Sequence, residues 1–208
     1  MVKFWVKLVS EPAMLSSKMY KYCYHNHYRG VEMKWITYVK DILYRNGLGY
    51  IWENQTVPNG NILTLLQQRL RDQFIQNWHA NINESSLASF YSILKHDFEY
   101  ENYLNFPSYE RVNICKLKCS NHKLPIETGR WREVRRDQRL CDKCNLSAIG
   151  DEYHFLLVCP FFSDLRSKFI PTYYWRYPSV NKLRSLFAGN RKTLSKLALF
   201  IQKGLNHY

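Results

Sequence analysis

The chain has 208 residues, of which 46% are hydrophobic and 16% aromatic, which suits one large domain or two small ones with a sizeable core. This composition excludes a disordered tail. No stretch approaches the ~20 consecutive apolar residues of a membrane span, and Lys3 and Lys7 interrupt the apolar N-terminal segment before it could act as a signal peptide. We therefore predict a soluble intracellular protein, in the nucleus or cytoplasm, with no membrane partner.

The charge is strongly positive and unevenly distributed. Thirty Lys and Arg residues against 17 Asp and Glu give a net charge of +13. Residues 1–110 carry 11 basic and 10 acidic residues, whereas residues 111–208 carry 19 and 7. A basic surface concentrates phosphates and releases their counterions on binding, so the C-terminal half favours a polyanionic partner. A solvated basic face without a partner explains the charge equally simply.

The predicted elements are mostly helices, because apolar residues recur at helical spacing along the chain. The clearest helix covers 61–80, where apolar residues follow one another in steps of four from Ile62 to Trp78. In chain order, helices are predicted after Ser10, over about 32–46 with Gly47 as its stop, over 61–80, after Ser85, Ser108 and Ser179, and over about 191–205. The sequence thus predicts a mainly α fold.

Two segments break the helical rhythm. Gly, Pro and Asn-Gly interrupt 47–60, and the polar, Arg-rich stretch 121–150 lacks any apolar period. Because no repeat, linker or low-complexity tract marks a sharp boundary, the simplest division is a helical N-terminal part, 1–120, and a basic zinc-binding C-terminal part, 121–208.

A metal-ligand pattern begins in the segment 121–150 and continues beyond it. Cys141, Cys144, His154 and Cys159 follow the spacing C-x2-C-x9-H-x4-C. Two cysteines three positions apart fit one tight turn, and a later His and Cys complete the four ligands of tetrahedral Zn²⁺. Three thiolates and one imidazole favour Zn²⁺ over Mg²⁺ or Ca²⁺. With four protein ligands the site is closed to water, so we predict a structural zinc knuckle that staples this segment.

The pattern also makes a geometric demand. His154 and Cys159 belong to a short predicted helix, and five residues along an α-helix rotate by ~140°, which separates the two side chains. They converge only if the helix loosens at Cys159, and Pro160 supplies this because the residue before a proline is pushed out of the helical region.

The remaining cysteines offer weaker alternatives. The six cysteines could form disulfides, but metal binding is favoured because no secretory segment is present and histidines lie among them. Cys115 and Cys119, followed by His122, could form half of a second metal site or could be ordinary thiols on one helical face. Cys23 and the nearby histidines at 25 and 27 offer the nearest further ligands, although the two histidines are more simply a polar surface patch.

Basic residues surround the zinc motif. Arginine forks bind phosphate, and an aromatic ring among them can stack on an unpaired base. For Trp131, packing against the zinc turn is the favoured alternative to base contact. The candidate nucleic-acid-binding residues are Arg130, Trp131, Arg132, Arg135, Arg136, Arg139 and Lys143.

Three stretches of this region, 120–132, 139–145 and 150–162, together resemble the zinc-binding region at the C-terminal end of reverse transcriptases from non-LTR (LINE-type) retrotransposons. The resemblance implies that the Cys, Cys, His and Cys at 141, 144, 154 and 159 are that family's zinc ligands. A polymerase needs paired aspartates to hold two metal ions, and the chain has no Asp-Asp pair. The resemblance thus points to a fragment without the polymerase.

Two functions of different classes follow from these observations. The first is a non-enzymatic zinc-binding module that contacts RNA or DNA with low specificity, through phosphates. The second is a zinc-ordered interaction or scaffold module, whose partner would be the polymerase part of the parent polyprotein. They differ in whether the arginines of 130–139 share a solvent-facing surface or pair with Glu127, Glu133 and Asp137. A nuclease is disfavoured because a closed zinc site activates no water.

Overall fold

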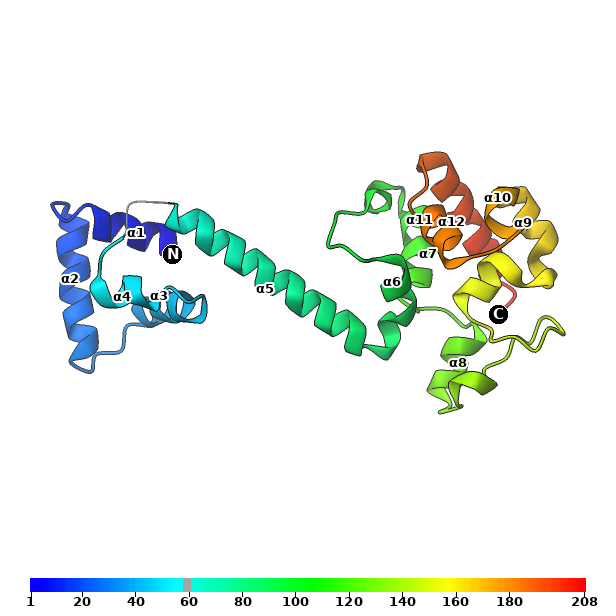
Figure 1. Ribbon diagram of the computed structural model, residues 1–208, viewed down its shortest axis with the longest axis horizontal. Helices are drawn as coiled ribbons and strands as arrows, with labels where there is room; N and C mark the ends of the chain where they lie inside the picture. The colour runs from blue at the N-terminus through cyan, green and yellow to red at the C-terminus, as the bar shows by residue number, and fades with distance from the viewer. Residues whose placement is uncertain (58–60) are drawn as a thin grey trace. The chain divides into compact units, whose positions relative to one another are not determined.

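The computed structural model describes residues 1–57 and 61–208, and most of them are helical (Figure 1). The one β-feature among these residues is an isolated antiparallel bridge between Leu140 and Ile149. The predicted mainly α fold is confirmed. The turn expected within 47–60 falls partly on residues 58–60, which lie outside the described residues.

Twelve α-helices are described, joined by short 3₁₀ turns and one π-helix. The α-helices are α1 (Val2–Ser10), α2 (Leu15–Tyr28), α3 (Lys34–Arg45), α4 (Gly49–Asn54), α5 (Ile62–Glu84), α6 (Ser89–Leu94), α7 (Ser108–Lys118), α8 (Pro125–Trp131), α9 (Ser163–Phe169), α10 (Thr172–Trp175), α11 (Val180–Phe187) and α12 (Arg191–Leu205). The π-helix covers His154–Val158, and the 3₁₀ turns cover Ser86–Ala88, Asn102–Asn105, Arg136–Gln138 and Pro160–Phe162.

The chain divides into two compact units, an N-terminal unit of Met1–Asn77 and a C-terminal unit of Trp78–Tyr208. The boundary falls within α5 and differs from the expected division at 120/121. That expected boundary lies inside the C-terminal unit, because α7 packs extensively against α12. By this division the N-terminal unit carries 10 basic and 5 acidic residues, and the C-terminal unit carries 20 basic and 12 acidic residues. Both units are therefore basic.

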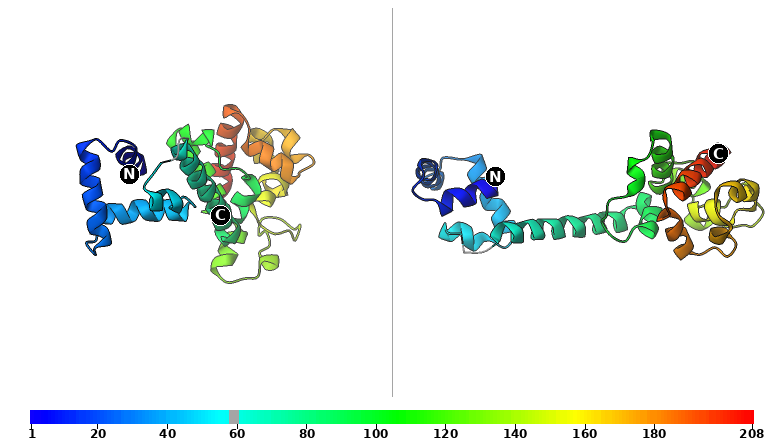
Figure 2. Two further views of the ribbon diagram at one scale, coloured as in Figure 1. Left: turned by 60° about the vertical axis from the view of Figure 1, so that its left-hand side comes forward. Right: turned by 90° about the horizontal axis from the view of Figure 1, so that it is seen from above.

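The N-terminal unit, seen from two further sides in Figure 2, is built around two tryptophans. Trp5 of α1 and Trp52 of α4 are fully buried, with ring centroids 5.6 Å apart. The indole of Trp5 donates to the Tyr20 hydroxyl at 2.8 Å, and burial raises the pKa of Tyr20 to about 12. The apolar face of α3 completes this core, and Gly47, at φ +66°, follows the end of that helix as predicted.

The C-terminal unit buries the apolar faces of α7 and α12 together with the π-helix. Glu110 of α7 is buried, accepts a hydrogen bond from Ser195 Oγ at 3.1 Å and forms an ion pair with Arg191 at 3.2 Å. Ser179 caps α11, as predicted, by accepting from the Lys182 amide at 3.3 Å. These contacts place the Arg-rich stretch 121–150, including α8, at the edge of a packed helical body (Figure 1).

Candidate metal centre

The four predicted ligands converge. One ligand atom from each of Cys141, Cys144, His154 and Cys159 lies within 4.8 Å of every other. Cys141 Sγ is 3.8 Å from Cys159 Sγ, and Cys144 Sγ is 3.3 Å from His154 Nε2. Cys141, His154 and Cys159 are buried and Cys144 is half-buried. The group can therefore hold a metal ion, as the spacing predicts.

The first two cysteines lie in a tight hairpin. The Leu140–Ile149 bridge closes it, with the Cys141 amide donating to the Ala148 carbonyl and the Gly150 amide to the Arg139 carbonyl, each at 2.8 Å. The end of this hairpin requires glycine at position 150, because a Cβ there would clash with Pro125 Cγ at 2.7 Å. The turn brings the thiols at 141 and 144 to a common point.

The second pair of ligands lies at the two ends of the π-helix. The Cys159 amide donates to the His154 carbonyl at 2.7 Å, the five-residue bond of a π turn. Cys159 itself has left the helical region, with φ −55° and ψ 119°, as expected before Pro160. The loosening is more extensive than predicted: the whole turn is widened, and this brings Cys159 into line with His154, five positions earlier. Asp151 Oδ1 fixes its beginning by accepting from the His154 amide at 2.8 Å.

Arg166 of α9 stabilises the end of the same turn, a role that the sequence analysis does not predict. It is 3% exposed and donates to three backbone carbonyls: Leu156 at 2.7 Å, Phe155 at 3.3 Å and Cys159 at 2.7 Å. The helical turn ends there, so its last carbonyls need donors from outside the helix; the Cys159 carbonyl also accepts from the Phe162 amide at 3.3 Å. Burial lowers the pKa of Arg166 to about 10, so the guanidinium stays charged at neutral pH.

The electrostatics of the ligands fit a metal. Burial, and then Arg166, lower the pKa of His154, which keeps the imidazole neutral as metal ligation requires. Burial raises the pKa of Cys159 to about 12, so without a cation this thiol stays protonated. A bound metal ion would replace the thiol protons of the three cysteines. With four protein donors the site is closed, and its effect is to hold the hairpin against the π-helix.

The other cysteine and histidine groups do not form a site. His122 Nε2 pairs with Glu152 at 3.0 Å, Cys115 lies 4.0 Å from the Tyr103 hydroxyl, and Cys119 is exposed. The Cys3His group is the single cluster of three or more potential ligands within residues 1–57 and 61–208. The two histidines beside Cys23 likewise belong to no such cluster.

Two of the predicted basic residues act inside the fold. Arg130 pairs with Glu127, which is buried, donating from Nε at 3.0 Å. Arg139 donates to the carbonyls of Val134 at 2.9 Å and Ile126 at 3.0 Å, and its side chain packs against Gly129. Both therefore stabilise the stretch around α8.

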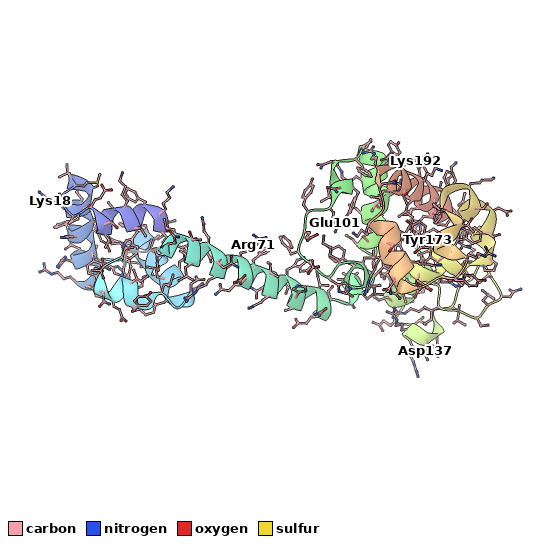
Figure 3. All side chains as sticks on the ribbon, turned by 45° about the horizontal axis from the view of Figure 1, so that its top comes forward. Lys18, Arg71, Glu101, Asp137, Tyr173 and Lys192 are labelled. Carbon is pink, nitrogen blue, oxygen red and sulfur yellow. The ribbon has the colours of Figure 1, made fainter. Side chains whose placement is uncertain are left out.

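The other predicted arginines are more accessible, whereas Lys143 is half-buried with its Nζ 4.8 Å from the Tyr208 ring centroid. Arg135 pairs with Asp137 at 3.1 Å, but the two side chains are 76% and 64% exposed, and such a surface pair opens easily. Figure 3 labels Asp137 on this part of the chain. Arg132 and Arg136 are exposed, and Lys143 lies 3.5 Å from Asp142. Trp131 is 58% exposed, so the packing role favoured for it is wrong.

No protein-family model, curated protein or solved structure matches the chain. Within the described residues, no helix combines the length and the apolar character needed to cross a membrane.

Proposed function

We propose that this chain is a non-enzymatic zinc-binding module that contacts nucleic acid. The observation that carries the proposal is the buried Cys3His group between the hairpin and the π-helix. Thiolate and imidazole donors in a four-fold set favour Zn²⁺ over harder cations. By its sequence resemblance the module would be the C-terminal zinc-binding part of a non-LTR reverse transcriptase, acting in the nucleus or cytoplasm.

The proposed nucleic-acid contact is with phosphates, in RNA or DNA, at low sequence specificity. Its candidate residues are the exposed Arg132, Arg135 and Arg136, together with the exposed Trp131 and the half-buried Lys143. Arg130 and Arg139 support this surface from within through Glu127 and the backbone. Backbone contacts by arginine and lysine give an affinity that falls steeply with salt.

The experiment compares the Arg132→Ala/Arg136→Ala double variant with the parent. We expect weaker binding to unrelated RNA and DNA sequences and a salt slope smaller by about two ion-release units. The matched control is Lys18→Ala/Lys21→Ala, which removes the same charge from exposed positions in α2. Zinc content and helicity, measured on each variant, should stay unchanged because exposed charges contribute little to stability.

The result that would contradict the proposal is equal binding by the parent and the arginine variant at every salt concentration. That result would favour a zinc-ordered scaffold, with the polymerase part of a polyprotein as partner. One observation supports this second function: Arg130 and Arg139 already have partners inside the fold.

A further inference from the structure

A second basic and aromatic surface lies in the segment 171–182. Tyr173 and Tyr177 are 65% and 73% exposed, and Figure 3 labels Tyr173. Between them, Tyr174 and Trp175 are half-buried against the core, and the Trp175 indole donates to the Ile170 carbonyl at 2.9 Å. The inward pair anchors the segment, so the two outward rings are held in place at a spacing of four residues.

Cations lie against both exposed rings. Lys182 Nζ is 4.8 Å from the centroid of Tyr173 and 5.9 Å from that of Tyr177, and the Arg176 guanidinium is 5.9 Å from the Tyr177 ring. The capped first turn of α11 fixes the backbone of Lys182. Neither Lys182 nor Arg176 has a carboxylate partner in the described residues.

The surrounding chain has no negative charge to neutralise these cations. After Asp164 the sequence contains nine Lys and Arg residues and no Asp or Glu through Tyr208. Three of the nine have partners within the fold: Arg166 and Arg184 bind backbone carbonyls, and Arg191 pairs with Glu110. The remaining cations, among them Lys182 and Arg176, repel one another unless an anion binds.

We propose that Tyr173, Arg176, Tyr177 and Lys182, here called the stacking surface, bind single-stranded nucleic acid. Unpaired bases stack on the two tyrosine rings while Lys182 and Arg176 contact the neighbouring phosphates. In a duplex the bases are already stacked and paired, so the tyrosine rings add no stacking contribution to the affinity for a duplex. The inference rests on the proposed function and deepens it by assigning a single-strand preference to a surface separate from Arg132 and Arg136.

The stacking surface is also connected to the metal centre. α10, which carries Tyr173, packs on the π-helix between His154 and Cys159 and on α11, which carries Lys182. Metal binding at the ends of the π-helix therefore supports the platform on which the rings are held.

The experiment measures fluorescence anisotropy with a labelled single-stranded 12-mer, as RNA and as DNA, and with the matched duplex. Because the alanine variant loses both stacking rings, Tyr173→Ala/Tyr177→Ala should weaken single-strand binding at least about tenfold and duplex binding less than about twofold. Tyr173→Phe/Tyr177→Phe keeps the rings and should bind as the parent does. Lys182→Gln, which leaves both rings, should weaken binding and reduce the salt slope by about one ion-release unit.

The outcomes separate this inference from the proposed function. Equal loss on single strand and duplex, or no loss, in the alanine variant would overturn the stacking surface. A parent protein that binds duplex but not single strands would also overturn the stacking surface, while the proposed function would remain supported. A parent that binds neither overturns both. Poly-glutamate that binds as tightly as the 12-mer, with the same sensitivity to the alanine variant, would instead assign the surface to an acidic protein.

Discussion

Arg166 is buried among apolar side chains, yet its partners are three carbonyls and no carboxylate. A charge in this position is expensive to bury unless its hydrogen bonds are complete. Here they also join carbonyls at the end of the π-helix, one of which belongs to the candidate ligand Cys159 and accepts from the Phe162 amide as well. A single side chain thus fixes the backbone on which a ligand depends.

We predict that Arg166→Met lowers the free energy of unfolding by about 3 kcal/mol or more, because it removes three hydrogen bonds from a buried charged donor to backbone carbonyls. Urea denaturation followed by circular dichroism measures this change. Lys168→Met, two positions along the same helix and exposed, is the control and should change stability by less than about 0.5 kcal/mol. Equal midpoints for the two variants would show that the carbonyls find other partners.

The cysteines offer a second test at this scale. Cys144→Ser removes a thiolate from a closed site and forfeits much of the metal's contribution to folding. Cys115→Ser replaces a half-buried thiol near Tyr103 and should cost only ~1–3 kcal/mol. We expect the larger fall in melting temperature, together with loss of bound zinc, for Cys144→Ser. Comparable shifts for both variants would point to a metal at Cys115 or to none at all.

At the scale of single residues, the sequence predicts the four candidate metal ligands but not the side chains that hold their backbone in place. The spacing of Cys141, Cys144, His154 and Cys159 is informative because metal geometry restricts it. Arg166 carries no such signal, because a guanidinium that binds carbonyls can lie at any distance along the chain. The same holds for Glu152, whose partner His122 lies 30 positions earlier.

Among the elements, the π-helix depends on close packing against α12. A Cβ on Gly204 would lie 2.7 Å from Phe155 Cζ, and Phe155 is held by the rings of Phe162 and Phe200 at 4.9 and 5.2 Å. The glycine therefore lets α12 approach the turn that carries His154 and Cys159.

Gly204→Ala should destabilise the protein although alanine is the better helix former. The gain in helix propensity is about 1 kcal/mol, whereas overpacking costs about 1–3 kcal/mol, and the ring of Phe155 has no space to move. We expect a lower urea midpoint and weaker zinc retention against a chelator. Lys203→Ala, exposed on the same helix, should leave both quantities unchanged. A more stable Gly204→Ala protein would mean that the Phe155 ring can shift to accommodate the added methyl group at little cost.

Strongly periodic helices are the elements that sequence predicts best. The helix predicted over 191–205 is α12 with the same bounds, and that over 61–80 is α5, Ile62–Glu84. α4 and α8 were not predicted, because they are short and lie among glycines and prolines. Tertiary burial forms them: Ile51 and Trp52 of α4 reach 1% and 0% exposure.

For the whole molecule, the units are defined by contacts between distant segments. Ile114 and Leu117 of α7 are fully buried in the same core as α12, so the boundary predicted at 120/121 would cut through that core. Periodicity reveals that α7 has an apolar face and not which helix covers it. The excess of basic residues counted in 111–208 is correct, but the contact boundary lies earlier in the chain and both compact units are basic.

Separate cores predict separate responses to metal removal. Chelation should raise hydrogen exchange in the hairpin and π-helix, and then across α9 and α12, because the metal centre belongs to the C-terminal unit. Peptides from α1 to α4 should keep their protection, since the core around Trp5 and Trp52 contains no ligand. Exchange measured by mass spectrometry checks this, and equal loss in both units would contradict the division.

The close sequence spacing of the metal ligands has a consequence for synthesis. Cys141 and Cys159 are 18 positions apart, whereas Glu110 and Ser195, which join α7 to α12, are 85 apart. Closing the longer loop costs roughly 1.4 kcal/mol more in chain entropy, and α12 is translated after every ligand. If the Cys3His group holds a metal ion, we expect a nascent chain to bind it while α12 is still inside the ribosome, so that the last helix closes over an occupied site.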